Sequence, residues 1–116
     1  MVRCTGRIFA LIDEACFSAT DNFLAALADL HPSVRFIGRP TNGPTGAPRQ
    51  VTTLAHSGAK LTLCVMRVSS PKGRLIEGAG TIPDVPVRWT RGDIAAARDP
   101  DLETALAPIR GSLRRL

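Results

Sequence analysis

Near its start, the sequence carries an unbroken apolar run, Ile8–Ile12, between Gly6 and the acidic pair that follows it. A short run without polar alternation is typical of a strand that is buried on both faces of a parallel sheet. The segment after it places Phe23, Leu24, Leu27 and Leu30 at helical spacing, and Val34–Ile37 has the composition of a second strand. The order strand, helix, strand within about 30 residues is that of a right-handed βαβ unit. The sequence therefore predicts an α/β fold.

The middle of the chain predicts a loop and a hairpin. Three Gly and three Pro fall between Gly38 and Pro48, which is typical of an irregular connection. The stretches Gln50–Ala55 and Lys60–Val68 alternate in polarity around His56-Ser57-Gly58. This pattern predicts a β-hairpin whose turn contains Ser57 and Gly58.

The last third predicts a short strand and a closing helix. Val85–Thr90 is expected to be the strand. Asp99 precedes Pro100, as a helix cap precedes a first helical proline. The helix is expected to carry its apolar face at Leu102, Leu106, Ile109, Leu113 and Leu116, and Pro108 is expected to kink or shorten it. We expect residues 1–116 to form a single domain.

The predicted strand Ile8–Ile12 raises a question of pairing. A buried parallel strand normally has neighbours on both sides. The other predicted segments supply only one or two. We therefore expect that the chain is the later part of a larger domain, or that a partner completes its sheet.

The charge pattern narrows the classes of function. The formal net charge of +5 comes from 13 Arg and 2 Lys against 10 acidic residues. The basic residues cluster only near the C-terminus. Nucleic-acid-binding proteins usually combine a basic stripe with aromatic stacking residues, and this chain has no Tyr, one Trp and four Phe. Nucleic acid is therefore not the expected partner. No apolar run approaches the roughly 18 residues of a membrane span, and no secretory signal is expected.

The residues that usually hold metals and cofactors do not form a pattern here. Cys4, Cys16 and Cys64 are widely spaced, which predicts buried free thiols rather than a disulfide framework. Asp13 and Glu14 have no further carboxylate or histidine at ligand spacing. The loop that follows Val34–Ile37 lacks the G-K-[ST] of a phosphate-binding loop. We expect no metal and no cofactor.

Ser18 is the strongest candidate for chemistry. It follows a predicted buried strand and begins a helix, where the next backbone N–H groups can stabilise an oxyanion. This is the logic of a nucleophile elbow without its flanking glycines. Ser18 with Asp21 three residues later also fits a helix capping box, and from these residues alone capping is the favoured interpretation.

Four other side chains each allow a structural and a catalytic interpretation. Cys16 is expected to be a packed thiol rather than a nucleophile, because Asp13 beside it disfavours a thiolate. His31 is expected at a helix end and His56 at a solvated hairpin turn, so neither is predicted to act as a base. Glu77 lies in a glycine-flanked loop, where a carboxylate is usually exposed but can also orient a base.

Six short motifs occur in a consistent order between Ile8 and Ile109. They are Leu11-Ile12-Asp13 with Ser18-Ala19-Thr20-Asp21, Phe36-Ile37-Gly38-Arg39-Pro40-Thr41-Asn42-Gly43, Lys60-Leu61-Thr62, Pro71-Lys72-Gly73-Arg74, Glu77-Gly78-Ala79-Gly80-Thr81-Ile82-Pro83-Asp84-Val85, and Asp101-Leu102-Glu103-Thr104-Ala105-Leu106. In this order and spacing they resemble the later half of the catalytic core of peptidase family S41. That family includes the tail-specific and carboxyl-terminal processing proteases and the core of tricorn protease.

The resemblance implies a Clp/crotonase-like α/β spiral fold and a serine peptidase activity on polypeptide substrates. Ser18 falls on the family's nucleophile, and the backbone N–H of Ala19 falls in its oxyanion hole. Glu77 falls on the glutamate that the tricorn-type branch uses. The resemblance also points to a bacterial envelope or secreted role, although no signal is recognised in the chain.

One departure from the family concerns the general base. The processing proteases place a lysine directly after the T-x-G motif, whereas here Pro44 follows Thr41-Asn42-Gly43. The chain therefore resembles the tricorn-type branch, whose histidine lies in an upstream segment. We expect the base to come from such a segment or from a partner, including a second copy of the chain. The alternative is a non-catalytic module with this fold that binds a peptide or another ligand.

Overall fold

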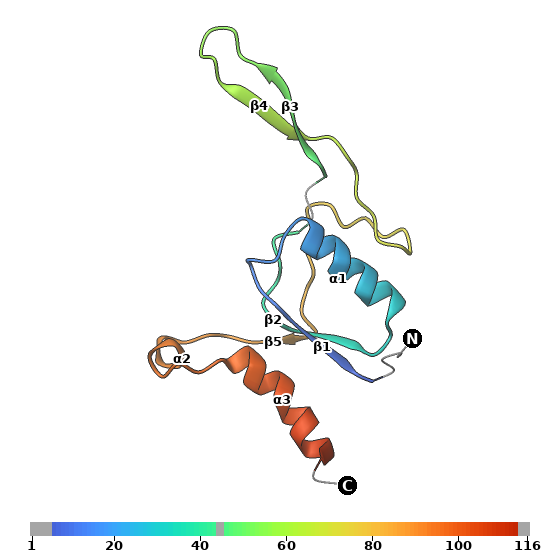
Figure 1. Cartoon of the computed structure of the whole chain (residues 1–116), viewed down its shortest axis with the longest axis vertical. Helices are drawn as coiled ribbons and strands as arrows, with labels where there is room; N and C mark the ends of the chain where they lie inside the picture. The colour runs from blue at the N-terminus through green and yellow to red at the C-terminus, as the bar shows by residue number, and fades with distance from the viewer. Residues whose placement is uncertain (1–5, 44–45, 114–116) are drawn as a thin grey trace, which may run out of the picture.

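The computed structural model describes residues 6–43 and 46–113. Cys4, Pro44 and Leu116, on which some of the expectations above rest, lie outside these residues. The elements in chain order are β1 (Ile8–Ile12), α1 (Ala19–Leu30), β2 (Val34–Gly38), β3 (Pro48–Thr53), β4 (Lys60–Cys64), β5 (Val85–Pro86), α2 (Arg91–Ala95) and α3 (Pro100–Leu113). Figure 1 shows α1 and α3 on opposite sides of the strands β1, β2 and β5.

The predicted βαβ unit is confirmed. The strands β1, β2 and β5 form one parallel sheet in the order β1-β2-β5, with Ile8 opposite Val34 and Ile12 opposite Gly38. Alternate residues of a strand point to opposite faces of the sheet. The side chains of Ile12, Val34 and Phe36 pack with Leu24 of α1 to form the core of the domain. The architecture is a small mixed α/β fold.

The first strand is less buried than its sequence predicts. Within the described residues, β1 pairs only with β2, so it lies at one edge of the sheet. Ile12 is buried, but Leu11 exposes 42% of its surface. The expectation of a strand buried on both faces is therefore wrong for this chain, because α3 and one neighbouring strand cover β1 only in part. A strand from elsewhere beside β1 stays a prediction.

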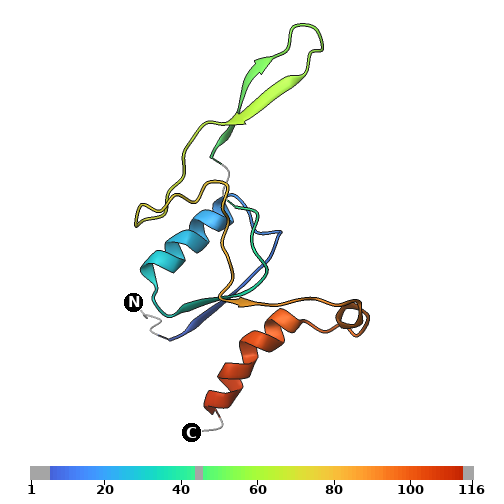
Figure 2. The same cartoon turned by 180° about the vertical axis from the view of Figure 1, so that it is seen from behind.

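The predicted hairpin is present and stands away from the rest of the chain (Figures 1 and 2). The strands β3 and β4 are antiparallel, with a register shift between Gln50 and Thr52. The strand β3 begins and ends two residues earlier than predicted, β4 ends four residues earlier than predicted, and every residue in both strands is exposed. Cys64 is exposed and Cys16 is half-buried, so the expectation of buried thiols is wrong for these two.

The helices differ from their sequence patterns in detail. In α1, Leu24 is buried, but Phe23 exposes 62% and Leu30 exposes 70% of its surface, because only one side of the helix meets the sheet. In α3, the Asp99 carboxylate accepts a hydrogen bond from the Leu102 N–H at 2.9 Å, as the predicted cap requires. The helix continues past Pro108. No helix in the described residues is long and apolar enough to cross a membrane.

The connection before α3 contains a helix that the sequence analysis did not predict. The predicted strand at Val85–Thr90 pairs only over Val85–Pro86, and Pro86 has no N–H with which to extend the ladder. The short helix α2 follows. It begins with a capping box in which Thr90 and Asp93 exchange side-chain and backbone hydrogen bonds.

Candidate functional site

Ser18 occupies a strained turn between β1 and α1. Its backbone angles are φ 58° and ψ −123°, in the left-handed half of the map that non-glycine residues seldom adopt. Such a conformation costs on the order of 1–3 kcal/mol and is found preferentially at functional sites. Ser18 stands at the N-cap of α1, yet its side chain makes no capping hydrogen bond. The capping-box interpretation is therefore wrong.

Three loops meet around Ser18. The Ser18 N–H donates to the Gly43 carbonyl at 3.0 Å, and the Asn42 N–H donates to the Cys16 carbonyl at 3.0 Å. Gly43 lies so close to the third loop that a Cβ on it would be 3.1 Å from the Gly80 nitrogen. The turn after β1, the loop after β2 and the loop before β5 are thus joined at the carboxyl end of the parallel sheet. Ligands commonly bind at this end of open α/β sheets.

Asp21 is the side chain that holds these loops together. It is only 1% exposed, although it is charged and lies in the first turn of α1. Its Oδ1 accepts hydrogen bonds from the Thr41 hydroxyl at 2.6 Å and the Thr81 hydroxyl at 3.0 Å. Its Oδ2 accepts from the Gly43 N–H at 2.9 Å. A buried carboxylate is tolerated only with such a set of donors, so Asp21 and its three partners form one unit.

The start of α1 offers a donor beside Ser18. The first four N–H groups of a helix have no partner within the helix, and they carry the positive end of its dipole. The Ala19 N–H is the first of these, and no residue in 6–43 or 46–113 accepts a hydrogen bond from it. This geometry suits the stabilisation of a developing oxyanion next to the Ser18 side chain.

Glu77 is half-buried rather than solvated in its loop. Its Oε2 is buried and has no hydrogen-bond partner among the described residues. This oxygen lies 3.2 Å from the position that a Cβ on Gly46 would occupy. Gly46 follows the loop that contacts Ser18 through Gly43. The expectation of an exposed carboxylate is therefore wrong, and Glu77 reaches the far end of the same loop.

The histidines and lysines of the chain lie away from Ser18. His31 is the C-cap of α1, so it is separated from Ser18 by the twelve residues of that helix, or about 18 Å at 1.5 Å per residue. His56 is exposed at the turn of the hairpin, as predicted. Lys60 lies on β4, and Lys72 donates its N–H to Asp29 at 2.9 Å. None of these four residues is placed to take a proton from Ser18.

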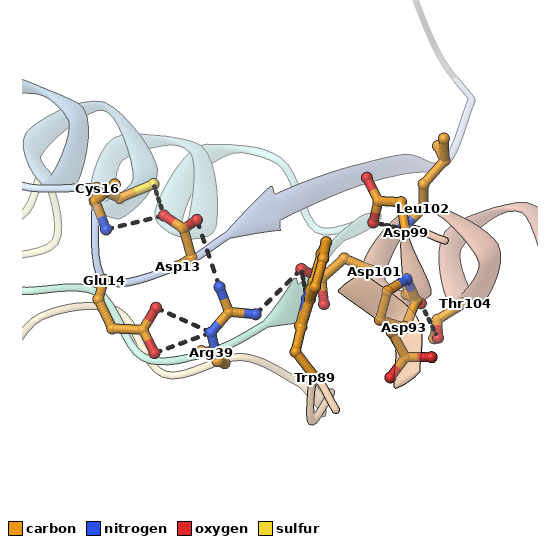
Figure 3. A network of polar contacts seen from close by, with 12 residues as sticks. Asp13, Glu14, Cys16, Arg39, Trp89, Asp93, Asp99, Asp101, Leu102 and Thr104 are labelled. Carbon is orange, nitrogen blue, oxygen red and sulfur yellow. Dashed lines mark hydrogen bonds and ion pairs between the residues drawn. The ribbon is translucent and has the colours of Figure 1, made fainter. Parts of the chain in front are cut away.

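A second polar cluster lies near the same end of the sheet, around Arg39 (Figure 3). The Arg39 guanidinium contacts three carboxylates: Glu14 at 2.9 Å, Asp101 at 3.3 Å and Asp13 at 3.5 Å. Its Cζ also lies 5.8 Å from the centre of the Trp89 ring, whose Nε1–H donates to Asp101. Arg39 therefore links the ends of β1 and β2 to the start of α3. A cavity of about 220 Å³ adjoins the cluster.

The Arg39 cluster predicts an acid-sensitive fluorescence change. Backbone hydrogen bonding at Glu14 and the Arg39 guanidinium hold the pKa of Glu14 below its ordinary value. Ionised Glu14 therefore contributes its full stabilisation of the folded state above about pH 4.3, the ordinary glutamate pKa. This contribution is lost as the pH falls through the lowered pKa of Glu14 in the folded chain. Trp89 is the sole tryptophan, so its emission should shift in that range. In Glu14→Gln the shift should shrink; an unchanged titration would contradict the assignment.

Neither Asp21 nor Arg39 is predicted from the sequence as a residue that joins distant segments. By its spacing of three residues from Ser18, Asp21 fits a capping box, whereas its partners in the structure lie 20 to 60 residues away. One signal was available: Thr41 and Thr81 each stand near a glycine in loops that follow or precede predicted strands. No group of three or more His, Cys, Asp or Glu in the described residues is arranged to hold a metal ion.

The comparisons with known proteins agree on one family. The model of peptidase family S41 matches residues 1–87. A protein from Parabacteroides merdae, provisionally described as a peptidase, has a similar structure, with a TM-score of 0.72, 27% identity and 86% of this chain covered. The tricorn protease gives a TM-score of 0.73 at 25% identity over 94% of this chain. Mature CPAF gives a TM-score of 0.63 at 27% identity, with 78% of this chain covered.

The chain is short beside these structures. It spans 30% of the Parabacteroides merdae chain, 11% of the tricorn protease and 17% of mature CPAF. No curated protein matches the sequence. The resemblance therefore concerns one part of each larger molecule.

Proposed function

We propose, on the premise that this chain belongs to peptidase family S41, that it contributes a serine nucleophile to the hydrolysis of peptide bonds. The observation that carries the proposal is the strained Ser18 turn at the start of α1. That turn combines a hydroxyl, a helix N-terminus and a network of buried hydrogen bonds at the carboxyl end of a parallel sheet. We also propose that residues 1–116 are one domain of the Clp/crotonase-like spiral type.

The proposed reaction is acyl transfer through Ser18. Ser18 Oγ attacks the carbonyl carbon of the scissile peptide bond, and its proton passes to a general base. The Ala19 N–H stabilises the oxyanion of the tetrahedral intermediate. The base returns the proton to the leaving amine as the C–N bond breaks, and water then hydrolyses the acyl-enzyme ester. In this proposal Glu77 orients the base or polarises the attacking water.

The general base belongs to another polypeptide segment in this proposal. Both histidines and both lysines of the sequence lie among the described residues, and none is near Ser18. General-base catalysis contributes about 10²–10⁴-fold in rate. The chain by itself should therefore be a slow enzyme, and a second copy or a separate segment is the expected source of the base.

Chemical rescue tests the role of Ser18. The purified chain should react slowly with a fluorophosphonate probe, and imidazole should raise the labelling rate about tenfold or more by acting as the missing base. Ser18→Ala should show no imidazole-dependent labelling, since it lacks the attacking oxygen. The measurement is probe incorporation against imidazole concentration, with circular dichroism to show that both proteins are folded.

The same experiment decides between the two functions. A non-catalytic module that binds a peptide is the second candidate, and the distance of both histidines from Ser18 favours it. If the folded chain shows no imidazole-dependent labelling, or if Ser18→Ala labels equally fast, the peptidase proposal fails and the binding module takes its place. Rapid labelling without imidazole, confined to a self-associated fraction, would indicate a base from a second copy.

A further inference from the structure

A cavity of about 380 Å³ lies at the opposite end of the sheet from Ser18, where β1 and β2 begin. Its lining residues are Arg7, Phe9, Pro32, Ser33, Arg35 and Pro108. The cavity is at the small end of the roughly 300–1,000 Å³ range of ligand pockets. From Phe9, which lines the cavity, β1 runs for three more residues to Ile12, about 10 Å at about 3.3 Å per residue, and the turn that leads to Ser18 begins only there. It is therefore a separate site, independent of the proposed peptidase function.

Strand geometry brings two arginines to the same face of the sheet. Ile8, Ala10 and Ile12 pack on the side of α1, so the alternate residue Phe9 points to the other side. Arg35 is the register partner of Phe9 and shares its face. Arg7 stands two residues before Phe9, again on that face. Strands about 4.8 Å apart with a rise of about 3.3 Å per residue place Arg7 and Arg35 diagonally, with their Cα atoms about 8 Å apart.

The guanidinium groups of Arg7 and Arg35 have no acidic partner among residues 6–43 and 46–113. In the described part of the structure, no carboxylate lies within ion-pair distance of Arg7 or Arg35, and no acidic residue lines the cavity. Arg39, by contrast, contacts three carboxylates. A hydrogen bond of 2.9 Å from Arg35 Nη1 to the Val34 carbonyl holds the Arg35 guanidinium against the strand. Two arginines with Cα atoms this close on one face, both exposed and with no carboxylate beside them among the described residues, favour the binding of an anion.

The rest of the lining is apolar or neutral. The half-buried Phe9 side chain and Pro32 offer an apolar surface beside the arginines, and the Ser33 hydroxyl adds a neutral hydrogen-bond donor. Arginine binds carboxylates through two parallel hydrogen bonds, which fixes their orientation. An anion without an apolar part, such as phosphate, would use the arginines and leave the Phe9 side of the cavity in water.

We propose that this cavity binds a carboxylate carried on an apolar group. The carboxylate lies between Arg7 and Arg35, and the apolar group packs on Phe9 and Pro32. Two sources share this chemistry: a free organic acid and the C-terminal carboxylate of a polypeptide with an apolar last residue. Nothing in the cavity is suited to break a bond, so the site binds its ligand without changing it.

The test compares charged and neutral forms of one probe on the full chain. N-acetyl-phenylalanine represents a polypeptide C-terminus, octanoate represents a free acid, and N-acetyl-phenylalaninamide is the neutral twin of the first. We expect N-acetyl-phenylalanine or octanoate to shift the amide NMR signals of Phe9 and Ser33 in a saturable way, and the amide to leave them unchanged. The acid that binds with the higher affinity identifies the source of the carboxylate: a polypeptide C-terminus for N-acetyl-phenylalanine, a free organic acid for octanoate.

Charge-removing variants complete the test. Arg7→Gln and Arg35→Gln should each weaken binding about tenfold or more, because each removes hydrogen bonds to a charged group. Arg49→Gln, on the exposed hairpin, removes the same charge elsewhere and should leave the affinity unchanged. Equal binding of the acid and its amide, no saturable shift, or equal affinity in Arg7→Gln and Arg35→Gln would each overturn the proposal. None of these readouts depends on Ser18, so the two proposals fail separately.

Discussion

Replacing Asp21 with alanine is expected to lower the free energy of unfolding by about 3–4 kcal/mol. The substitution leaves the Gly43 N–H and the hydroxyls of Thr41 and Thr81 without their shared acceptor. Each unpaired buried polar group costs about 1–3 kcal/mol, and the Asp21 side chain that these groups surround is only 1% exposed. Urea denaturation followed by circular dichroism measures the loss.

Two controls separate the hydrogen bonds from charge and volume. Asp21→Asn keeps the shape of the side chain and one acceptor oxygen. A threonine hydroxyl can turn to accept a hydrogen bond from the new NH₂ group, so the free energy of unfolding should fall by only about 1–2 kcal/mol. Glu103→Gln removes a charge from the first turn of α3 at an exposed position and should change stability by less than about 0.5 kcal/mol. A loss in Asp21→Ala no larger than in Glu103→Gln would show that Asp21 does not hold the loops.

The hydrogen bonds of Asp21 also predict an effect on the reactivity of Ser18. The loop that it fixes through Gly43 is the loop that accepts the Ser18 N–H. In Asp21→Asn, which should remain folded, imidazole-dependent labelling of Ser18 should therefore fall more than the stability loss explains. The comparison is made well below the denaturation midpoint, where both proteins are native. Equal labelling in Asp21→Asn and the unaltered chain would limit Asp21 to a structural role.

Replacing Gly38 with alanine is expected to cost about 3 kcal/mol or more. Gly38 ends β2 at φ +127°, where an L side chain is strained, and an added Cβ would lie 2.1 Å from the Ile12 carbonyl oxygen. That oxygen is held in place by the Arg39 N–H at 2.9 Å. Relief of the clash therefore requires β1 and β2 to separate at their carboxyl ends. Denaturant unfolding measures the cost.

Gly58→Ala is the matched control for Gly38→Ala. Gly58 also has positive φ, at +68°, but no atom lies within 4 Å of an added Cβ. The free energy of unfolding of Gly58→Ala should therefore fall only by the cost of backbone strain, about 1 kcal/mol. Trp89 emission should also change in Gly38→Ala, since the Arg39 cluster adjoins the displaced strand ends, and should not change in Gly58→Ala. Similar losses in the two variants would rule out the close approach as the cause.

The local elements of this fold follow from the sequence because their causes are local. Apolar runs, helical spacing, the Asp99 cap and the glycine-rich turn each act within a few residues, and they predicted β1, α1, β2, the β3–β4 hairpin and α3. The family could also be predicted, because six ordered motifs carry more information than any one of them. The short helix α2 was missed, although its Thr90 and Asp93 capping box is a local signal.

Burial and the site geometry were decided by contacts between distant segments. The exposure of Leu11 depends on how many strands and helices reach β1, which no pattern within β1 records. Ser18 and Asp21 fit a capping box by spacing alone, yet Asp21 turns to Thr41, Gly43 and Thr81 because those donors converge on it in the folded chain. A side chain with two competing sets of partners takes the set that leaves fewer buried groups unpaired. The sequence by itself determined the family and the order of the elements other than α2, whereas only the tertiary structure decided what the polar side chains around Ser18 bind, because their partners lie far away along the chain.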